Sequence, residues 1–506
     1  MESFFIYDDL SIDQAKEGFV VNAKIMMRAV HFVMIFLFLS LLWVNCSSQT
    51  PVADGTSSPD ASSTQDSSTI TDNPPQDQNQ TTPDISAPVD NNTNPDKSTP
   101  ADKGKTSAYT YHKHIRPLIE QRCLHCHKKG GIGPFELTEY KKIHGLRHAI
   151  KQAVVTRKMP PWSATRTCSE YKDDFSLTDQ EIKMVSDWVE AGAPEGKAED
   201  FKPREKKFKV GIDRVDLSLK MPKPYKPLKN PDDYRCFVIP WTKKKTTYVT
   251  GFQIKAGQPA IVHHVIAYLI EKKDAAKYLK KEEADKHPGY ECFGGPGGNG
   301  SWLGAWAPGL PGGNYPKNTG IRVEPGSLIV LQLHYNVLQS NPAPDQTAIE
   351  LQLADNVPLR GRLIPLADPK WTRGNGMPIP AGKKDVKHST ELSIKLPIAI
   401  TIHNVGLHMH LLGKSGHMYL KKKDGSKVCL LNIPRWDFDW QIMYSLNKTV
   451  KFEPGDSIGL SCTWDNTPEK QPTKDGKKLP PRDVKWGDGS TDEMCLGVVY
   501  ISHPNF

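Results

Sequence analysis

The strongest constraint on the fold comes from the last part of the chain, from about residue 213 to Phe506. Short runs rich in Val, Ile, Tyr and Thr alternate there with turns rich in Gly, Pro, Asn and Asp. Runs of this kind predict β-strands, and long helical periodicity is absent. About 300 residues are generous for one β-sandwich and comfortable for two. We therefore predict two all-β antiparallel sandwich domains, at residues 213–362 and 363–506.

Two histidines lie two positions apart in one apolar run, Gly406-Leu407-His408-Met409-His410-Leu411-Leu412. On a β-strand this spacing puts both imidazoles on one face. Neutral imidazoles are common ligands of first-row transition metals, so the pair would form half of a metal site. The alternative is a pair of surface or hydrogen-bonded histidines on an ordinary strand.

Three more histidines lie in apolar, strand-like runs: Ile261-Val262-His263-His264-Val265 and Leu331-Gln332-Leu333-His334-Tyr335. An unpaired polar ring in such a run is costly, which suggests that the three share one metal. Neighbouring residues of a strand point to opposite faces, however. His263 and His264 can bind the same metal only if a bulge or bend turns one of them.

Met494, in Thr491-Asp492-Glu493-Met494-Cys495, is the third ligand that we choose for His408 and His410. A soft thioether beside two imidazoles favours copper, whereas zinc prefers thiolate, imidazole or carboxylate. The alternative is a methionine of the hydrophobic core.

Cys123-Leu124-His125-Cys126-His127 is a Cys-x-x-Cys-His motif. This motif predicts a covalently bound haem c, with thioether bonds from Cys123 and Cys126 and with His127 as the proximal iron ligand. A redox cysteine pair and half a zinc site are the alternatives. An apolar stripe predicts a helix that leads into the motif: Ile115, Leu118 and Ile119.

The second axial ligand of this haem is predicted to be Met159, in an extended Met-Pro-Pro-Trp loop. His144 and His148, four residues apart on an expected helix, are the rival ligands. A capping box at 178–181 predicts a closing helix with apolar residues on one face. Residues 107–200 thus resemble a small, all-α, class I-like cytochrome c domain fused to another oxidoreductase.

The N-terminal 46 residues predict an export signal, with the apolar run Val33–Val44 behind Arg28. Translation is expected to begin at Met26 or Met27. Cys46 ends a stretch that resembles a bacterial lipobox, so we expect a lipid-anchored protein of the cell envelope, periplasmic or on the outer surface. It would be secreted if Cys46 is not lipidated. Residues 47–106, rich in Ser, Thr, Pro and Asp, predict a disordered linker, and 201–212 a connector.

Motifs along the β-rich region together resemble the copper type II monooxygenases, the family of dopamine β-hydroxylase and peptidylglycine α-hydroxylating monooxygenase. In chain order they are Tyr234-Arg235-Cys236, His263-His264, Trp306-Ala307-Pro308-Gly309, Leu331-Gln332-Leu333-His334-Tyr335, His408-Met409-His410 and Asp492-Glu493-Met494-Cys495. The resemblance spans nearly the whole C-terminal region.

The resemblance implies two jelly-roll-like sandwiches, each with one copper ion, separated by a solvent cleft. It implies an electron-relay copper on His263, His264 and His334. It also implies an oxygen-binding, catalytic copper on His408, His410 and Met494.

Two positions depart from the peptide-amidating members, which hold a substrate carboxylate with an arginine and a tyrosine. This chain has Gly406 and Val498 there, so a peptide ending in glycine is not the expected substrate.

Nine cysteines are present. Setting aside Cys46 and the haem pair leaves an even number, as expected of an exported, disulfide-bonded protein. The resemblance implies disulfides Cys236–Cys292 and Cys462–Cys495. Cys168 and Cys429 are left over, and the sequence does not decide whether they pair or stay free.

The sequence thus predicts an exported copper monooxygenase that hydroxylates a C–H bond of a small-molecule or peptide substrate with O2. Its electrons would come from an external donor, an ascorbate-like molecule or a redox protein, through the haem. The alternative is a non-catalytic copper-binding or electron-transfer lipoprotein. The net charge of +9 comes from scattered lysines, so no nucleic-acid partner is expected.

Overall fold

The computed structural model describes residues 108–129, 131, 133–205, 211–307, 312–337, 341–374, 376–474 and 476–506. The expected export signal, Cys46 and the whole of the expected linker lie outside the described residues, as do Pro308 and Gly309. Among the helices that are described, none is both long and apolar enough to cross a membrane. All described residues belong to one compact unit, which includes residues 104–506.

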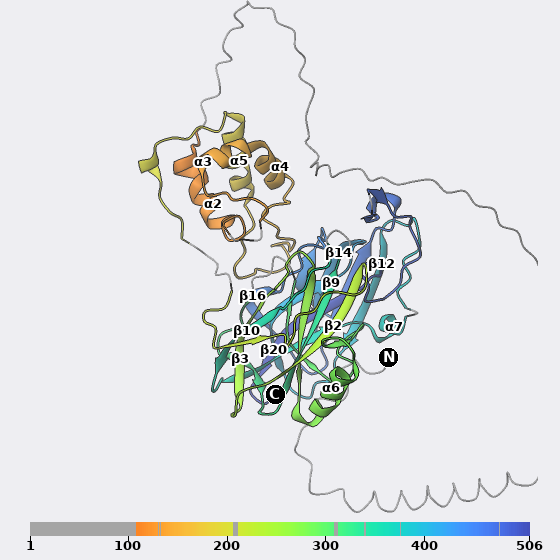
Figure 1. Ribbon diagram of the computed structural model, residues 1–506. Coiled ribbons are helices and arrows are strands. Elements are labelled where there is room, and N and C mark those ends of the chain that lie inside the picture. The colour runs from red at the N-terminus through yellow and green to blue at the C-terminus, as the bar shows by residue number, and fades with distance from the viewer. Residues whose placement is uncertain are drawn as a thin grey trace, which may run out of the picture. The chain divides into compact units, whose positions relative to one another are not determined.

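A small helical domain comes first (Figure 1). Its elements are η1 (Tyr111–Ile115, a π-helix), α2 (Arg116–Arg122), α3 (Tyr140–Gly145), α4 (Arg147–Val155), α5 (Asp179–Glu190) and η2 (Ala198–Asp200). The apolar stripe expected before the Cys-x-x-Cys-His motif is buried on η1 and α2, since Ile115, Leu118 and Ile119 are at most 4% exposed. The motif itself follows directly after the end of α2.

The closing helix α5 begins as predicted. Thr178 accepts a hydrogen bond from the Glu181 amide, and the Glu181 carboxylate accepts one from the Thr178 amide, which completes the capping box. The buried face of α5 packs Trp188 and Val189 into the core of the helical domain. Gly192, with a φ of +82°, lies just past the helix end, where a left-handed conformation is common.

The N-terminal sandwich is built from two groups of strands. One contains β1 (Leu217–Lys220), β10 (Ala348–Ala354), β3 (Thr247–Lys255), β7 (Gly313–Asn314) and β8 (Thr319–Val323). The other contains β6 (Ser301–Trp306), β4 (Val262–Ile270), β9 (Leu328–Asn336), β2 (Asp232–Pro240) and β5 (Tyr290–Glu291). The groups pack face to face, because Gly304 of β6 lies against the ring of Phe252 of β3.

The C-terminal sandwich has a sheet of β12 (Val386–Ser393), β17 (Ser457–Trp464), β14 (Gly413–Lys421) and β15 (Lys427–Ile433). Its other sheet contains β16 (Tyr444–Phe452), β13 (Ile400–His408) and β20 (Leu496–His503). Gly497 of β20 lies against Leu460 of β17, so the two sheets share a core. Smaller elements are α7 (Pro369–Thr372), η3 (Pro468–Lys470) and the pair β18 (Thr473–Lys474) and β19 (Lys477–Lys478).

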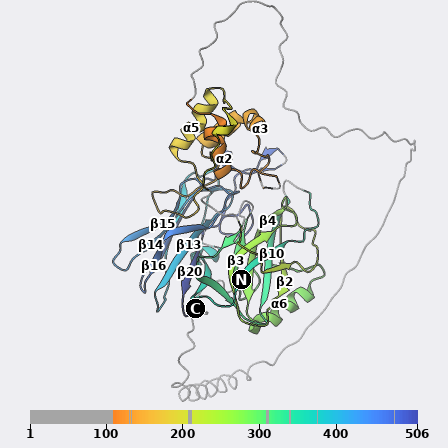
Figure 2. The same cartoon turned by 90° about the vertical axis from the view of Figure 1, so that its left-hand side faces the viewer.

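One strand joins the two sandwiches. The strand β11 (Leu359–Leu366) pairs with β6 and β8 of the first sandwich and with β20 of the second. The boundary that we expected between residues 362 and 363 therefore falls inside this strand. Figure 2 shows β13–β16 and β20 on one side, and β2, β3, β4 and β10 on the other.

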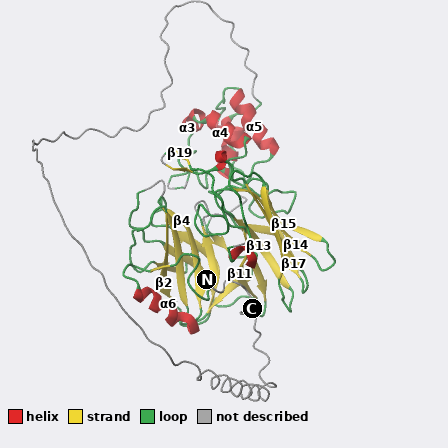
Figure 3. Ribbon diagram, turned by 90° about the vertical axis from the view of Figure 1, so that its right-hand side faces the viewer, coloured by secondary structure: helices red, strands yellow, loops and turns green. Residues whose placement is uncertain are grey.

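The β-rich region also contains one long helix among its described residues. The helix α6 (Lys272–Ala284) is red in Figure 3 beside β2. Among its residues only Tyr278 is fully buried, so the helix carries almost no apolar periodicity that a sequence pattern could reveal.

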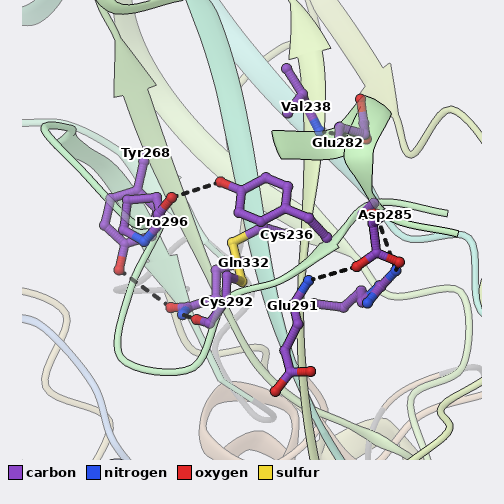
Figure 4. Close-up of a disulfide and its surroundings, with 12 residues drawn as sticks. Cys236, Val238, Tyr268, Glu282, Asp285, Glu291, Cys292, Pro296 and Gln332 are labelled. Carbon is purple, nitrogen blue, oxygen red and sulfur yellow. Dashed lines mark hydrogen bonds and ion pairs between the residues drawn. A yellow bond between two sulfur atoms is a disulfide. The ribbon is translucent and has the colours of Figure 1, made fainter. Parts of the chain in front are cut away.

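Three disulfides are present among the described residues. Two of them, Cys236–Cys292 and Cys462–Cys495, are the pairs that the resemblance implies. Around the first, Gln332 donates to the carbonyl of Cys292 and accepts from Tyr268 (Figure 4). The third, Cys168–Cys429, decides the open question: the leftover cysteines pair, and they tie the helical domain to β15.

Candidate metal centres

Three imidazole nitrogens converge at the first histidine group. The Nδ1 atoms of His263, His264 and His334 lie 3.2 to 3.3 Å from one another. The centre of such a triangle is about 1.9 Å from each nitrogen, close to the distance of about 2.0 Å at which first-row metals such as zinc bind imidazole. The three side chains therefore fit one metal ion.

Strand register explains how this group forms. His264 of β4 is paired directly with His334 of β9, and the pairing shifts register between Val262 and His264. This irregularity is the bulge that the adjacent histidines require, because it lets His263 point to the same side as His264. The strand β2 is the other neighbour of β9, and the ring of its Tyr234 stacks on His334 at 4.2 Å.

A carboxylate orients His334. The Nε2–H of His334 donates to Asp232 Oδ1 at 2.8 Å, and the same oxygen accepts from Asn336 and from Ser490, each at 2.9 Å. Although burial raises it, these hydrogen bonds hold the pKa of Asp232 at about 2. With its proton on Nε2, His334 presents the Nδ1 lone pair to the other two rings, an arrangement typical of metal-bound histidines.

The second group lies at the end of β13. The rings of His408 and His410 are 4.9 Å apart. His408 donates from Nδ1 to Gln441 Oε1, and His410 donates from Nδ1 to the carbonyl of Asp492 at 3.0 Å. Both rings therefore keep Nε2 for a metal ion.

Met494 comes just before β20, which runs antiparallel beside β13. The last pair of this ladder is His408 with Leu496, and the register continued by two residues puts Met494 opposite His410. Opposite residues of an antiparallel pair point to the same face, which agrees with the expected ligand role of Met494, and this role stays a prediction.

A buried carboxylate holds the segment around His410 in place. Glu493, fully buried, accepts hydrogen bonds from the amides of His410 and Leu412 at 2.9 and 2.6 Å and from Trp464 Nε1 at 2.8 Å. Burial raises its pKa to about 7. The adjacent Cys462–Cys495 disulfide anchors the same segment to β17.

Burial lowers the pKa values of four of these imidazoles, which favours their neutral, metal-binding form. Burial lowers the pKa of His263 to about 3 and that of His408 to about 4. It lowers the pKa values of His264 and His410 well below 6.5. Four neighbouring rings thus have lone pairs available at ordinary pH, which suits metal ions that prefer imidazole.

The two groups adjoin each other. The rings of His264 and His408 are 6.3 Å apart, so the solvent cleft that the resemblance implies between the two sites is not open here. The 434–443 loop, between β15 and β16, covers both groups. Its Phe438 stacks on His263 at 4.8 Å, and its Trp436 donates to the carbonyl of His410.

The haem expected at the Cys-x-x-Cys-His motif stays a prediction, and the structure shows how the motif residues lie. Cys123 and Cys126 are the described cysteines outside disulfides, and burial raises their pKa values to about 12 and about 11. His127 donates from Nδ1 to the carbonyl of Phe135 at 3.0 Å, which leaves Nε2 for iron. Gly133 allows this approach, since a Cβ there would be 2.6 Å from His127 Nδ1.

Met159, His144 and His148 were the residues expected as the second axial ligand of the haem. Met159 is 37% exposed, after the end of α4, and its assignment stays a prediction. His144 lies on α3 and His148 on α4, in two different helices where we expected one.

Three residues that orient the ligands were not identified from the sequence: Asp232, Gln441 and Glu493. Glu493 lies inside the quoted motif that contains Met494, and Asp232 begins the strand that carries the quoted Tyr234, so both positions could have been considered. Gln441 had no such signal, because only the fold brings it to His408.

Two family models match the chain. The N-terminal domain of the copper type II ascorbate-dependent monooxygenases matches residues 217–342, and the C-terminal domain matches residues 371–504, together just over half of the chain. No curated protein sequence is detectably similar.

Some solved structures are similar over large parts, although their scores are too low to carry an argument. A peptide-N(4)-(N-acetyl-β-D-glucosaminyl) asparagine amidase is 8% identical over 57% of this chain and 96% of its own, with a TM-score of 0.27. An allantoicase is 10% identical over 48% and 81%, with a TM-score of 0.14. The assignment therefore rests on the two domain matches, and the chain belongs to the copper type II ascorbate-dependent monooxygenases.

Proposed function

We propose that the chain hydroxylates a C–H bond with two copper ions. Its family consists of oxidoreductases that incorporate oxygen from O2, with ascorbate as the electron donor. One copper ion is bound by His263, His264 and His334, the other by His408, His410 and Met494. The convergence of three Nδ1 atoms at 3.2 to 3.3 Å is the observation that carries this proposal.

Two sites are needed because of the electron count. Hydroxylation consumes one O2, two electrons and two protons, and it yields one hydroxyl group and one water. Copper, when bound, supplies these electrons one at a time. The protein's part is to fix the imidazoles through Asp232, Gln441 and the Asp492 carbonyl, so that no reorganisation is needed when the metal changes oxidation state.

The residues beside His408 and His410 favour a substrate that has no carboxylate near Gly406 and Val498. A Cβ on Gly406 would lie 2.6 Å from Met443 Sδ, so a methionine occupies the space beside the glycine. Val498 is 8% exposed. Where peptide-amidating members place charge and a phenol, this chain therefore has apolar groups, which favour a neutral or apolar substrate.

We further propose that the helical domain is a cytochrome c-like domain whose haem passes electrons to the copper sites. The disulfide Cys168–Cys429 and hydrogen bonds from Ser169 Oγ to the carbonyl of Cys429 and from Tyr171 to that of Leu430 support this, because they join the two parts permanently. An external donor, ascorbate or a redox protein, would reduce the haem.

We also propose that the protein is located outside the cytoplasm. Disulfides persist in oxidising compartments, in keeping with the expected export signal. Lipidation of Cys46 would anchor the protein to the envelope membrane.

The test is oxygen consumption by the reduced, copper-loaded protein, with and without neutral candidate substrates. We expect substrate-dependent consumption that disappears in His408→Ala. A protein that binds copper but consumes no O2 with any substrate would support the rival function, a copper-binding or electron-transfer lipoprotein.

A further inference from the structure

Aromatic rings form a continuous series from the haem-attachment motif to the C-terminal sandwich. His125, between the two motif cysteines, has its ring 5.0 Å from that of Phe175. Phe175 in turn lies 6.0 Å from Trp440 of the 434–443 loop, with the two rings nearly perpendicular at 88°. Trp440 is 8% exposed, so water is largely excluded from this contact.

The series ends at a copper ligand. Gln441 follows Trp440 in the chain, and its Oε1 accepts the hydrogen bond from His408 Nδ1. Gln441 Nε2 donates to the carbonyl of Phe438 at 2.7 Å, which fixes the orientation of the amide. From the indole of Trp440 to the His408 ring, the connection therefore consists of covalent bonds and one hydrogen bond.

Hydrogen bonds join the helical domain to the segment around Trp440. Arg435, in the same loop as Trp440, donates to the carbonyls of Thr156 and Arg157 in the helical domain. Lys172 N donates to the carbonyl of Ser445 at 2.8 Å. The helical domain is thus hydrogen-bonded both to the 434–443 loop and to β16, the strand that follows this loop.

We propose that Phe175 and Trp440 form an electron-transfer path from the haem on Cys123, Cys126 and His127 to the copper on His408 and His410. This inference rests on the proposed function. Electron-transfer rates fall steeply with distance across non-bonded gaps, and the path has few such gaps. In each passage one electron leaves the ferrous haem, which becomes ferric, and Cu²⁺ at His408 becomes Cu⁺. No proton and no covalent bond is exchanged, and the external donor reduces the haem again.

The path delivers the electron to the oxygen-binding site without use of the His263 group. Phe438 of the same loop stacks on His263 at 4.8 Å, and this contact is through space, whereas Trp440 is joined to His408 by covalent bonds and one hydrogen bond. The connection to His408 is therefore the better coupled one.

The experiment follows haem reoxidation in the full chain loaded with haem and Cu²⁺. A light-generated one-electron donor reduces the haem, absorbance then records its reoxidation, and freeze-quench EPR shows which copper loses its Cu²⁺ signal. We expect Phe175→Leu and Trp440→Leu to slow reoxidation by about tenfold or more, and Trp440→Phe to keep most of the rate. The haem potential and the copper EPR parameters should stay those of the wild type.

Trp241→Leu is the matched control, because Trp241 is a similarly buried indole, 6% exposed, in the N-terminal sandwich. Phe175 is only half-buried, so Phe175→Leu serves if Trp440→Leu does not fold. Wild-type reoxidation rates in Phe175→Leu, or first reduction of the His263 copper, would overturn the path. A wild-type haem that passes no electron to either copper would refute the haem-fed function itself.

Discussion

His334 donates its Nε2–H to Asp232 at 2.8 Å, and its Nδ1 faces the Nδ1 atoms of His263 and His264. One carboxylate thereby sets the tautomer of a ligand on a neighbouring strand. Ser490, from the C-terminal sandwich, donates to the same oxygen, so this hydrogen-bond network also links the two domains.

Asp232→Asn tests this role. The amide keeps the shape but loses the charge, so its oxygen accepts a weaker hydrogen bond from His334 and favours the Nε2–H tautomer less. We expect copper affinity at the His263 group to fall by about 10- to 100-fold. Titration against a copper chelator measures it, with Ser490→Ala as a control that removes one of the hydrogen bonds and should have a smaller effect. Equal affinities in Asp232→Asn and the wild type would contradict the role.

Glu493→Gln tests the buried carboxylate beside Met494. One oxygen that accepts from backbone amides becomes a donor, so an amide of the 410–412 segment or Trp464 Nε1 loses its partner. We expect the free energy of unfolding to fall by about 1–3 kcal/mol, measured by denaturant titration of the metal-free protein. The exposed Glu469→Gln should leave the unfolding free energy unchanged.

The disulfide between the helical domain and β15 has a measurable local effect. Replacing Cys168 and Cys429 with serine should raise amide hydrogen exchange at Thr165 and Lys172, which donate to the carbonyls of Asn432 and Ser445. Loss of the disulfide should lower the free energy of unfolding by about 2–4 kcal/mol. Serine at Cys462 and Cys495 is the matched control and should leave these two amides protected. Unchanged exchange at Thr165 in the first variant would show that the disulfide is not what holds the segment.

Gly406→Ala probes the space beside the second histidine group. The new methyl would meet Met443 Sδ at 2.6 Å, and overpacking of this kind costs about 1–3 kcal/mol. Met443→Ala in the same chain should recover most of the loss of stability. If the losses of unfolding free energy in Gly406→Ala and Met443→Ala add in the double variant, the new methyl group and Met443 do not meet.

Sequence patterns predicted the parts of this molecule that depend on local chemistry. The capping box at Thr178 and Glu181, the apolar stripe before the haem motif and the strand character of the histidine runs all follow from residue type and spacing. The requirement for a bulge at His263 also followed from strand geometry, and the register shift beside Val262 meets it.

What the sequence could not predict depends on contacts between distant segments. The pairing of Cys168 with Cys429 spans 261 residues, and Gln441 reaches His408 only because the 434–443 loop folds over both histidine groups. The α6 helix buries a single tyrosine fully, so tertiary context and not periodicity stabilises it. The strand β11 crosses the expected domain boundary because it pairs with both sandwiches.

The most direct test of the account is the number of copper ions bound per chain, measured by metal analysis together with EPR in the wild type, His263→Ala and His408→Ala. We predict two copper ions in the wild type and one in each variant, with a different EPR signal remaining in each. A wild type that binds no more than one copper ion, or variants that keep both, would contradict the two-site monooxygenase.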